Sequence, residues 1–258
     1  MDTAAYLARI GLSPASVDAP TVRTLRRLQR AHVTTVPFEN LSIVGRPPSP
    51  DDAPGVDLSP AALYEKIVEH ERGGYCFELN GLFRDLMVAL GYEVDRLAAR
   101  VTSALQTPAN HHVLRVHLDE PLIVDVGTGP PMLRRPLPLD GSSRTDEAGV
   151  VWRVVASERS DTDYCAEVRP PDASEWSARH VFTATPRPHS YFDAANEYLQ
   201  SAPESPFTGD PLVALSTDDG CRRLAGETLT HVQGSNTTEC PVPDAERADV
   251  SSRFFGLF

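Results

Sequence analysis

The sequence has few of the features that mark membrane, secreted or nucleic-acid-binding proteins. No apolar run approaches the roughly 18–20 residues that a membrane-spanning helix needs, and residues 1–4 do not begin a secretory signal. The formal net charge of −12 argues against the broad positive surface that binds nucleic acids. Among 24 basic residues, Lys66 is the only lysine. We therefore expect a cytoplasmic protein with no membrane or nucleic-acid partner.

Cysteine is scarce as well. The four cysteines, at positions 76, 165, 221 and 240, form no CxxC pair, which argues against zinc and thioredoxin-type sites. A chain of 258 residues buries roughly 70–75% of its unfolded surface, so its core does not depend on a disulfide or a metal. His112 and His117 would face opposite sides of one strand, which argues against a metal site there. We expect no metal and no permanently bound cofactor.

The hydrophobic pattern changes from helical to strand-like after Gly91. Hydrophobic residues make up 41% of the chain and charged residues 23%, an ordinary globular composition. Helical spacing before Gly91 gives way to short alternating runs separated by glycine, proline and serine. The pattern predicts helices over 20–33, 59–70, 76–90, 191–200 and 244–257, and strands over 94–101, 111–118, 121–126, 150–157, 164–169 and 179–184. It predicts a loop over 45–58 and a loop or hairpin excursion over 130–149. Helices segregated from antiparallel strands are typical of the α+β class.

Cys76 is the most informative residue. It follows the glycine-rich segment 72–75 and begins a predicted helix. The first-turn N–H groups and the helix dipole are therefore expected to lower the pKa of its thiol, as suits a nucleophile. The alternative is a buried cysteine that packs as a small apolar side chain. Local sequence leaves both interpretations open.

A nucleophilic cysteine needs a base, and the base needs an orienting group. His111 and His112 begin an alternating strand, so only one of the two can face Cys76. Asp125 ends an apolar run and is a stronger candidate for the orienting group than Asp119, which lies in a predicted exposed turn. On a tight hairpin of the two strands, His111 and Asp125 can lie side by side.

The turn after Asp125 contains Gly127, Thr128 and Gly129. Successive N–H groups in a glycine-rich turn can hold phosphate oxygens, although an ordinary turn is at least as compatible with this sequence. The segment matches neither a dinucleotide-binding fingerprint nor a Walker loop.

Several segments, taken in order, resemble the arylamine N-acetyltransferase family. The most specific is Arg-Gly-Gly-Tyr-Cys-Phe-Glu-Leu-Asn at 72–80, which is similar to that family's active-site cysteine motif. The other similar segments are 36–41, 111–116, 124–127 and 203–207. The resemblance extends over nearly the whole chain.

The resemblance implies a three-part fold with a cysteine-protease-like Cys-His-Asp core. Its parts would be a helical bundle, a β-barrel-like domain and an α/β lid, over 1–91, 92–190 and 191–258. It implies that Cys76 is the nucleophile, that His111 rather than His112 is the base, and that Asp125 orients the base. By the same resemblance, Arg72 and Glu39 would form a buried structural ion pair. Residues expected to contact substrate or coenzyme A are Phe38, Gly127, Thr128, Gly129 and Phe207.

The activity implied by the resemblance is transfer of an acetyl or other short acyl group from acetyl-CoA to an arylamine-type acceptor. The acyl group would rest on the cysteine between two half-reactions, with coenzyme A as co-substrate and not as a bound cofactor. One alternative is an amide synthase of the same family, which takes a chain from an acyl carrier protein in natural-product biosynthesis. A thioester hydrolase and a non-enzymatic binding domain are alternatives of other classes.

Thr128 departs from the family pattern, because many members carry an aromatic residue there that lines the acceptor pocket. Threonine removes a ring and adds a hydroxyl group. The substitution therefore predicts a wider and more polar pocket, for an acceptor bulkier or less flat than a simple arylamine.

Overall fold

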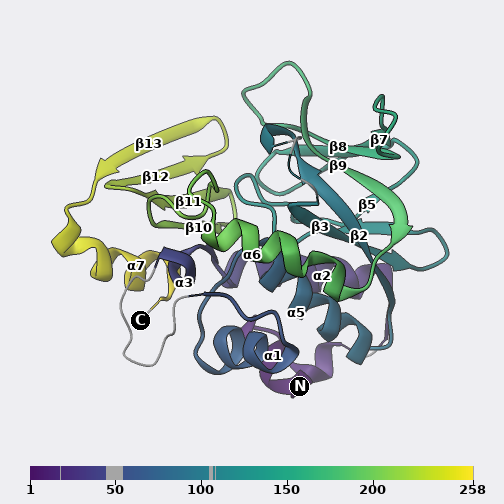
Figure 1. The fold of residues 1–258 in the computed structure, drawn as a ribbon, viewed down its shortest axis with the longest axis horizontal. Helices are drawn as coiled ribbons and strands as arrows, with labels where there is room; N and C mark the ends of the chain where they lie inside the picture. The colour runs from purple at the N-terminus through teal and green to yellow at the C-terminus, as the bar shows by residue number, and fades with distance from the viewer. Residues whose placement is uncertain (18, 45–54, 105–106, 108, 258) are drawn as a thin grey trace.

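The computed structural model describes residues 1–17, 19–44, 55–104, 107 and 109–257. Most of the predicted loop 45–58 lies outside these residues. A helical layer, a large curled sheet and a smaller sheet near the C-terminus make up the molecule (Figure 1). No helix in the described ranges is long and apolar enough to cross a membrane.

The N-terminal helices pack around a shared apolar core. They are α1 (Thr3–Arg9), α2 (Val22–Thr35), α3 (Leu41–Val44), α4 (Pro60–Tyr64) and α5 (Cys76–Ala89). Asp2, Thr21 and Ser59 each accept a first-turn N–H group with a side-chain oxygen, so α1, α2 and α4 begin at these caps. Leu25 of α2 and Phe83 of α5 are fully buried in the common core.

An eight-stranded antiparallel sheet forms the barrel-like part. Its strands are β2 (Glu93–Val101), β3 (His111–His117), β4 (Leu122–Val124), β5 (Leu137–Pro138), β6 (Arg144–Thr145), β7 (Val151–Ala156), β8 (Tyr164–Arg169) and β9 (Ser177–Pro186). Their order is β5-β4-β3-β2-β9-β8-β7-β6, and β5 also contacts β7, so the sheet curls toward closure. Trp152 and Phe182 are buried in its interior.

The smaller sheet combines a short strand from the N-terminal part of the chain with strands from the C-terminal part. Its order is β1-β10-β11-β12-β13, and its strands are β1 (Phe38–Glu39), β10 (Leu212–Ser216), β11 (Gly220–Ala225), β12 (Thr228–Gln233) and β13 (Asn236–Pro241). β1 pairs with β10, with Phe38 opposite Ala214. Helix α7 (Arg247–Phe255) packs against β10. Helix α6 (Asp193–Ser201) is tied to the N-terminal layer because the Tyr75 hydroxyl donates to Asn196 Oδ1.

The α+β class is confirmed, and the six predicted strands are present with ends shifted by at most two residues at either end. Four elements differ from the prediction, and one of them is the helix expected over 244–257, which begins with a 3₁₀ turn over Asp244–Glu246 before α7. The helix expected over 59–70 is α4 followed by a π-helical turn over Glu65–Glu69, and the helix expected over 191–200 begins with a 3₁₀ turn over His189–Phe192. The excursion 130–149 contains the two short strands β5 and β6. The division into three domains stays a prediction.

A buried ion network fixes the segment that leads into α5. Glu39 of β1 lies 3.5 Å from Arg72 Nη2 and 3.6 Å from Lys66 Nζ. Lys66 Nζ also lies 2.7 Å from Glu78 Oε1, and the other Glu78 oxygen accepts the Tyr75 N–H. The expected Arg72–Glu39 pair is thus part of a larger cluster. Burial raises the pKa of Glu78, while Glu39 and Glu78 outweigh the burial of Lys66 and raise its pKa.

Lys66→Met would leave two buried carboxylates, Glu39 and Glu78, without the ammonium group that lies between them. We expect the free energy of unfolding to fall by about 3–5 kcal/mol, because an uncompensated buried charge is costly. Urea denaturation at pH 7 measures the change. Lys66→Arg keeps the charge and should lose less. A loss no larger than the ~1 kcal/mol typical of an exposed pair would contradict this account.

His32 makes the helical core sensitive to acid. It is fully buried, its Nδ1 pairs with the Tyr6 hydroxyl at 3.1 Å, and burial together with the charge of Arg9 lowers its pKa to about 3 from 6.5. Between those pH values the unfolded chain binds a proton that the folded chain does not. Stability is therefore lost as the pH falls below about 6.5.

We expect His32 alone to account for about 2 kcal/mol of the stability lost between pH 7 and pH 5. His32→Gln should reduce the difference between urea unfolding free energies at the two pH values by that amount, whatever its effect at pH 7. His70→Gln, at an exposed histidine, is the control. An unchanged pH dependence in His32→Gln would show that the imidazole is not the acid-sensitive group.

Candidate active site

Cys76 is the first residue of α5 and only 3% exposed. Its Sγ donates to the carbonyl oxygen of Asn110 at 3.8 Å, so the thiol lies beside the backbone that leads into His111. Cys76 and His111 line the same cavity, whose volume is about 670 Å³.

The prediction of a lowered Cys76 pKa is wrong. Burial is the largest effect and raises the pKa of the thiol, and the negative charge of Asp125 raises it further. The Phe77 N–H group at the start of α5 does lower it, as expected of a helix N-terminus, but burial outweighs that contribution. A pKa raised in this way favours the protonated thiol at neutral pH, so a base that takes its proton would aid its reaction.

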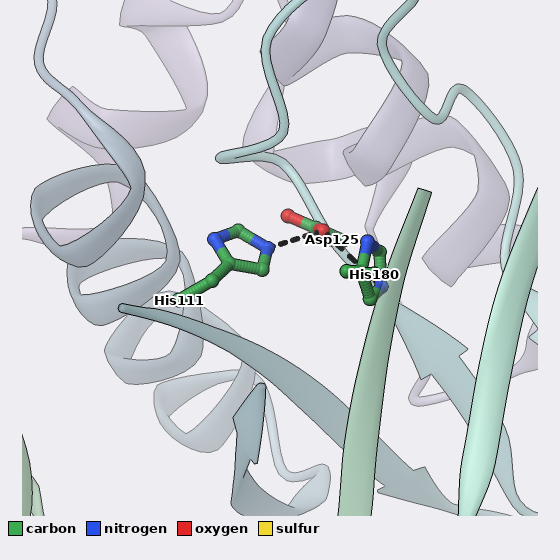
Figure 2. Close-up of side chains that lie close together, drawn as sticks. All are labelled: His111, Asp125 and His180. Carbon is green, nitrogen blue, oxygen red and sulfur yellow. Dashed lines mark hydrogen bonds and ion pairs between the residues drawn. The ribbon is translucent and has the colours of Figure 1, made fainter. Parts of the chain in front are cut away.

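His111 is held by Asp125. Its Nε2 lies 2.7 Å from Asp125 Oδ2, and its other ring nitrogen points away from the carboxylate (Figure 2). Although burial acts to raise the pKa of Asp125, His111 and hydrogen bonds bring it well below its usual range. An ionised carboxylate can only accept, so Nε2 carries the proton and Nδ1 carries the free lone pair. His111 can therefore accept a proton on Nδ1.

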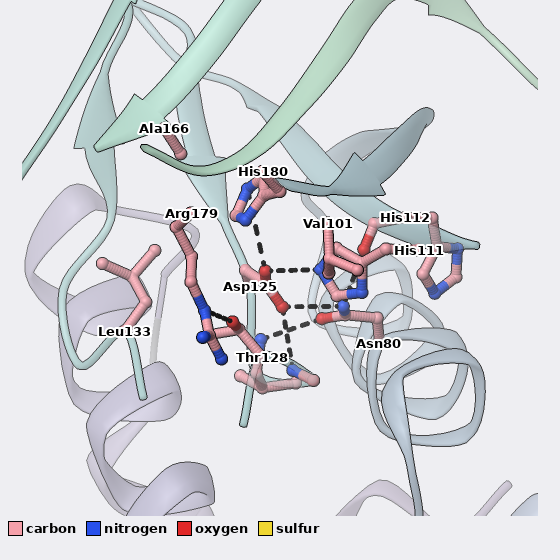
Figure 3. Close-up of polar contacts among 12 residues, drawn as sticks. Asn80, Val101, His111, His112, Asp125, Thr128, Leu133, Ala166, Arg179 and His180 are labelled. Atoms are coloured by element: carbon pink, nitrogen blue, oxygen red, sulfur yellow. Dashed lines mark hydrogen bonds and ion pairs between the residues drawn. The ribbon is translucent and has the colours of Figure 1, made fainter. Parts of the chain in front are cut away.

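Asn80 connects the helix to the aspartate, and the sequence analysis quoted it without giving it a role. Its Nδ2 donates to Asp125 Oδ1 at 2.9 Å and to the His112 carbonyl oxygen at 2.8 Å, and its Oδ1 accepts the Val126 N–H (Figure 3). Asn80 lies four residues after Cys76, on the same face of α5. This spacing of four residues was the sequence feature that could have indicated a role for Asn80 in the site.

His111 and His112 face opposite sides of β3, as alternation predicted. The ring of His112 packs against Phe77 and Phe192, with centroids 5.5 Å and 4.9 Å away. Burial lowers its pKa well below the ordinary histidine value, so it stays neutral. Its surroundings are those of a core residue.

Arg179 and His180 of β9 are the site residues that the sequence analysis missed. His180 is 1% exposed, its Nε2 lies 4.0 Å from Asp125 Oδ2, and its ring centroid lies 5.2 Å from that of His111 (Figures 2 and 3). Burial lowers its pKa to about 3. In the described part of the chain, His111, Asp125 and His180 are the one group of three or more His, Cys, Asp or Glu side chains whose potential metal-ligand atoms lie within 4.8 Å of one another. The 2.7 Å distance between His111 Nε2 and Asp125 Oδ2 is that of a direct hydrogen bond.

The predicted pocket residues line one cavity: Phe38, Gly127, Thr128, Gly129 and Phe207. Gly127 lies against the nucleophile candidate, because a Cβ built on it would be 2.7 Å from Cys76 Cα and 2.8 Å from Cys76 O. A Cβ on Gly129 would have only ordinary contacts, 3.7 Å from Arg179 and from Phe38. The first glycine thus serves close packing, whereas the second leaves room for a Cβ at ordinary contact distances.

These features define a class of enzymes: a cysteine at a helix N-terminus, in one cavity with a histidine that an aspartate holds. Comparisons with known proteins narrow the class. A family model described as N-acetyltransferase matches residues 21–257. The arylamine N-acetyltransferase of Mycolicibacterium smegmatis is 35% identical over 248 residues, which cover 93% of this chain and 85% of that protein.

Solved structures agree. The arylamine N-acetyltransferase of Salmonella typhimurium matches with a TM-score of 0.88 at 28% identity, covering 100% of this chain and 92% of that one. The Mycobacterium marinum arylamine N-acetyltransferase in complex with CoA matches with a TM-score of 0.86 at 32% identity, covering 99% and 93%. The chain therefore belongs to the arylamine N-acetyltransferase family, and it is an acyltransferase of that type.

Gly127→Ala tests the close approach of the turn to Cys76. The added Cβ overlaps the Cys76 backbone and lies 2.9 Å from Asn80 Nδ2, so the turn or the helix must move. We expect the free energy of unfolding to fall by about 1–3 kcal/mol, together with a changed rate of Cys76 alkylation by iodoacetamide. Gly129→Ala is the matched control and should leave stability within about 0.5 kcal/mol. Equal losses in the two variants would contradict the assignment.

Proposed function

We propose that the protein transfers an acetyl or other short acyl group from a coenzyme A thioester to an arylamine-type acceptor by a ping-pong mechanism. In this mechanism Cys76 is the nucleophile, His111 the base and Asp125 the orienting group. The observation that carries the proposal is that Cys76 and His111 line one cavity while Asp125 holds the other side of the imidazole. The relative that binds CoA in its solved structure supports the choice of donor.

The first half-reaction acylates the cysteine. His111 Nδ1 accepts the thiol proton as Cys76 Sγ attacks the thioester carbonyl carbon. The new carbon–sulfur bond forms, the bond to the coenzyme A sulfur breaks, and the leaving thiolate takes the proton from the imidazolium. Asp125 stabilises that imidazolium through the 2.7 Å hydrogen bond. One thioester is exchanged for another, so the exchange is nearly balanced in free energy.

The second half-reaction transfers the acyl group to the amine. The amine nitrogen attacks the acyl carbon, His111 accepts one proton from it, and the Cys76 sulfur leaves and regains that proton. The cavity suits an aromatic acceptor because Phe38 and Phe207 line it, with ring centroids 6.1 Å apart. Thr128 and Gly129 complete the proposed acceptor side. The neighbouring Gly127 keeps the turn close to the acyl-bearing cysteine.

The expected product of acetyl-CoA and the protein alone is an acetyl adduct on Cys76, measured by intact mass and peptide mapping. Adding an arylamine should remove the adduct and yield the amide. Cys76→Ala should form no adduct. The control is Cys221→Ala, because Cys221 lines the same cavity from β11 and should be dispensable.

Other outcomes identify the alternatives. Rapid loss of the adduct to water at a rate that the amine does not change would make the protein a thioester hydrolase. An adduct from a carrier-bound chain but not from acetyl-CoA would make it an amide synthase. An adduct that persists in Cys76→Ala would overturn the assignment of the nucleophile.

A further inference from the structure

A β-bulge brings a second imidazole to the buried carboxylate of the site. In the pairing of β8 with β9, two consecutive residues of β8 are opposite Ala178 and His180, so Arg179 is an extra residue in the register. Such a bulge changes the direction of the side chains next to it. Arg179 and His180 are adjacent in sequence, yet both point toward the turn around Asp125 (Figure 3). The bulge therefore adds a histidine to a carboxylate that already has one.

His180 is closed off from water without a hydrogen bond. Its side chain is 1% exposed, and among the residues that the structure describes neither ring nitrogen has a hydrogen-bond partner. Buried polar atoms are normally hydrogen-bonded, so an imidazole of this kind calls for an explanation. Burial keeps the ring neutral, so one nitrogen carries a proton and the other a free lone pair. A neutral imidazole in this state is a common metal ligand.

One oxygen of the Asp125 carboxylate can take a further partner. Oδ1 accepts hydrogen bonds from Asn80 Nδ2 and from the Gly127 N–H. Oδ2 accepts a hydrogen bond from His111 Nε2 at 2.7 Å and lies 4.0 Å from His180 Nε2. The longer distance exceeds that of a hydrogen bond. Both imidazoles are thus directed at one oxygen, and only one of them is bonded to it (Figure 2).

The three side chains are spaced for a small metal ion. Their ligand atoms all lie within 4.8 Å of one another. Zinc bonds to histidine nitrogen and carboxylate oxygen measure about 2.0–2.2 Å, so the ligand atoms of a tetrahedral site lie about 3.3 Å apart. The observed 2.7 Å and 4.0 Å distances each differ from that value by about 0.7 Å or less. Small shifts of the two rings would therefore complete the geometry.

The donor set selects among ions. Two imidazole nitrogens and one carboxylate oxygen suit Zn²⁺ and the neighbouring transition metals, whereas Mg²⁺ and Ca²⁺ prefer oxygen ligands. The ionised Asp125 offsets part of the positive charge. His111 also lines the active-site cavity, which gives an ion a path from solvent and supplies water for a fourth ligand.

We propose that His111, Asp125 and His180 form an inhibitory site for Zn²⁺, which binds as an exchangeable inhibitor and not as a resident cofactor. Coordination at His111 Nε2 moves the proton of that nitrogen to Nδ1, so the imidazole stays neutral and no proton is released. Nδ1 is the atom that accepts the Cys76 proton in the proposed mechanism. The bound ion therefore removes the base without binding the cysteine. Zinc binding itself does not depend on the proposed function, because it involves neither acyl donor nor amine.

The first measurement uses Co²⁺ as a spectroscopic substitute for Zn²⁺, on protein dialysed against EDTA and then into buffer without thiols. We expect the visible bands of a four- or five-coordinate Co²⁺ ion, no near-ultraviolet band from a thiolate ligand, and the same spectrum in Cys76→Ala. A thiolate band that disappears in Cys76→Ala would show that the cysteine holds the ion, and the proposal would be wrong. Absence of the visible bands would overturn it as well.

The second measurement is the Zn²⁺ dissociation constant, obtained by competition with a chromophoric chelator. We expect it to rise at least 10- to 100-fold in His180→Phe and His180→Gln, because even the outer partners of metal ligands are typically worth that much. Near-ultraviolet circular dichroism identifies a variant that fails to fold. Zn²⁺ should also raise the Tm of the wild-type protein. An unchanged constant in a folded His180 variant, or an unchanged wild-type Tm, would overturn the proposal.

His117→Gln is the matched control. His117 lies on the same strand as His111 and also pairs with an aspartate, Asp95, at 2.8 Å, but its side chain is 36% exposed. The substitution should leave the Zn²⁺ dissociation constant within about twofold of the wild-type value. A loss equal to that of the His180 variants would show that the ion binds at the surface, against the proposal.

Alkylation of Cys76 by iodoacetamide reports on His111 without any acyl donor. Saturating Zn²⁺ should slow the reaction at least about tenfold, EDTA should restore the rate, and His180→Phe should need a correspondingly higher Zn²⁺ concentration. Zinc that binds without slowing alkylation would show that His111 is not a ligand, and the proposal would fail. If these results hold while acetyl-CoA does not acylate Cys76, the metal site stands and the proposed function is wrong.

Discussion

The buried Asp125 carboxylate is the contact on which the rest of the site depends. It joins three separate parts of the chain: Asn80 of α5 and the Gly127 N–H bind one oxygen, and His111 of β3 binds the other. An ionised group without solvent is stable only when such partners surround it. Satisfying this one charge therefore holds the helix that carries Cys76 against the strand that carries His111. The second imidazole, His180, is kept neutral by burial and lies beside His111, 4.0 Å from the same carboxylate oxygen.

Close backbone packing at the start of α5 also holds Cys76 in place. A Cβ on Gly73 would lie 2.2 Å from the Pro37 carbonyl oxygen, and a Cβ on Gly127 would overlap Cys76. The cysteine is thus enclosed between β1 and the turn after β4. The Glu39 and Lys66 contacts hold that segment in place. Close approach and buried charge act together here, since the glycines bring the segments near and the ion network fixes their orientation.

The sequence predicts those parts of the fold that depend on local pattern. Alternation located the strands and put His111 and His112 on opposite faces, and local pattern pointed to Cys76 and Asp125. Motif resemblance then chose among the alternatives that remained open. The sequence pattern did not reveal β1, a two-residue strand that pairs with β10 far along the chain. Nor did it reveal Arg179, because simple alternation would send adjacent residues of β9 to opposite faces, and only the register with β8 shows the bulge. Lys66 was likewise seen as the single lysine, but its partners are set by tertiary packing.

The raised pKa of the Cys76 thiol explains why the groups around it must be arranged in advance. In water a thiol is partly ionised near neutral pH, but here burial and the charge of Asp125 both oppose a free thiolate. In the proposed mechanism the proton leaves to His111, which lines the same cavity, and the imidazolium so formed is stabilised by the carboxylate that disfavours the thiolate. Asp125 thus suppresses ionisation of the resting cysteine and supports proton transfer to His111. In the proposed mechanism the thiol is therefore protonated at rest and becomes nucleophilic as His111 takes its proton.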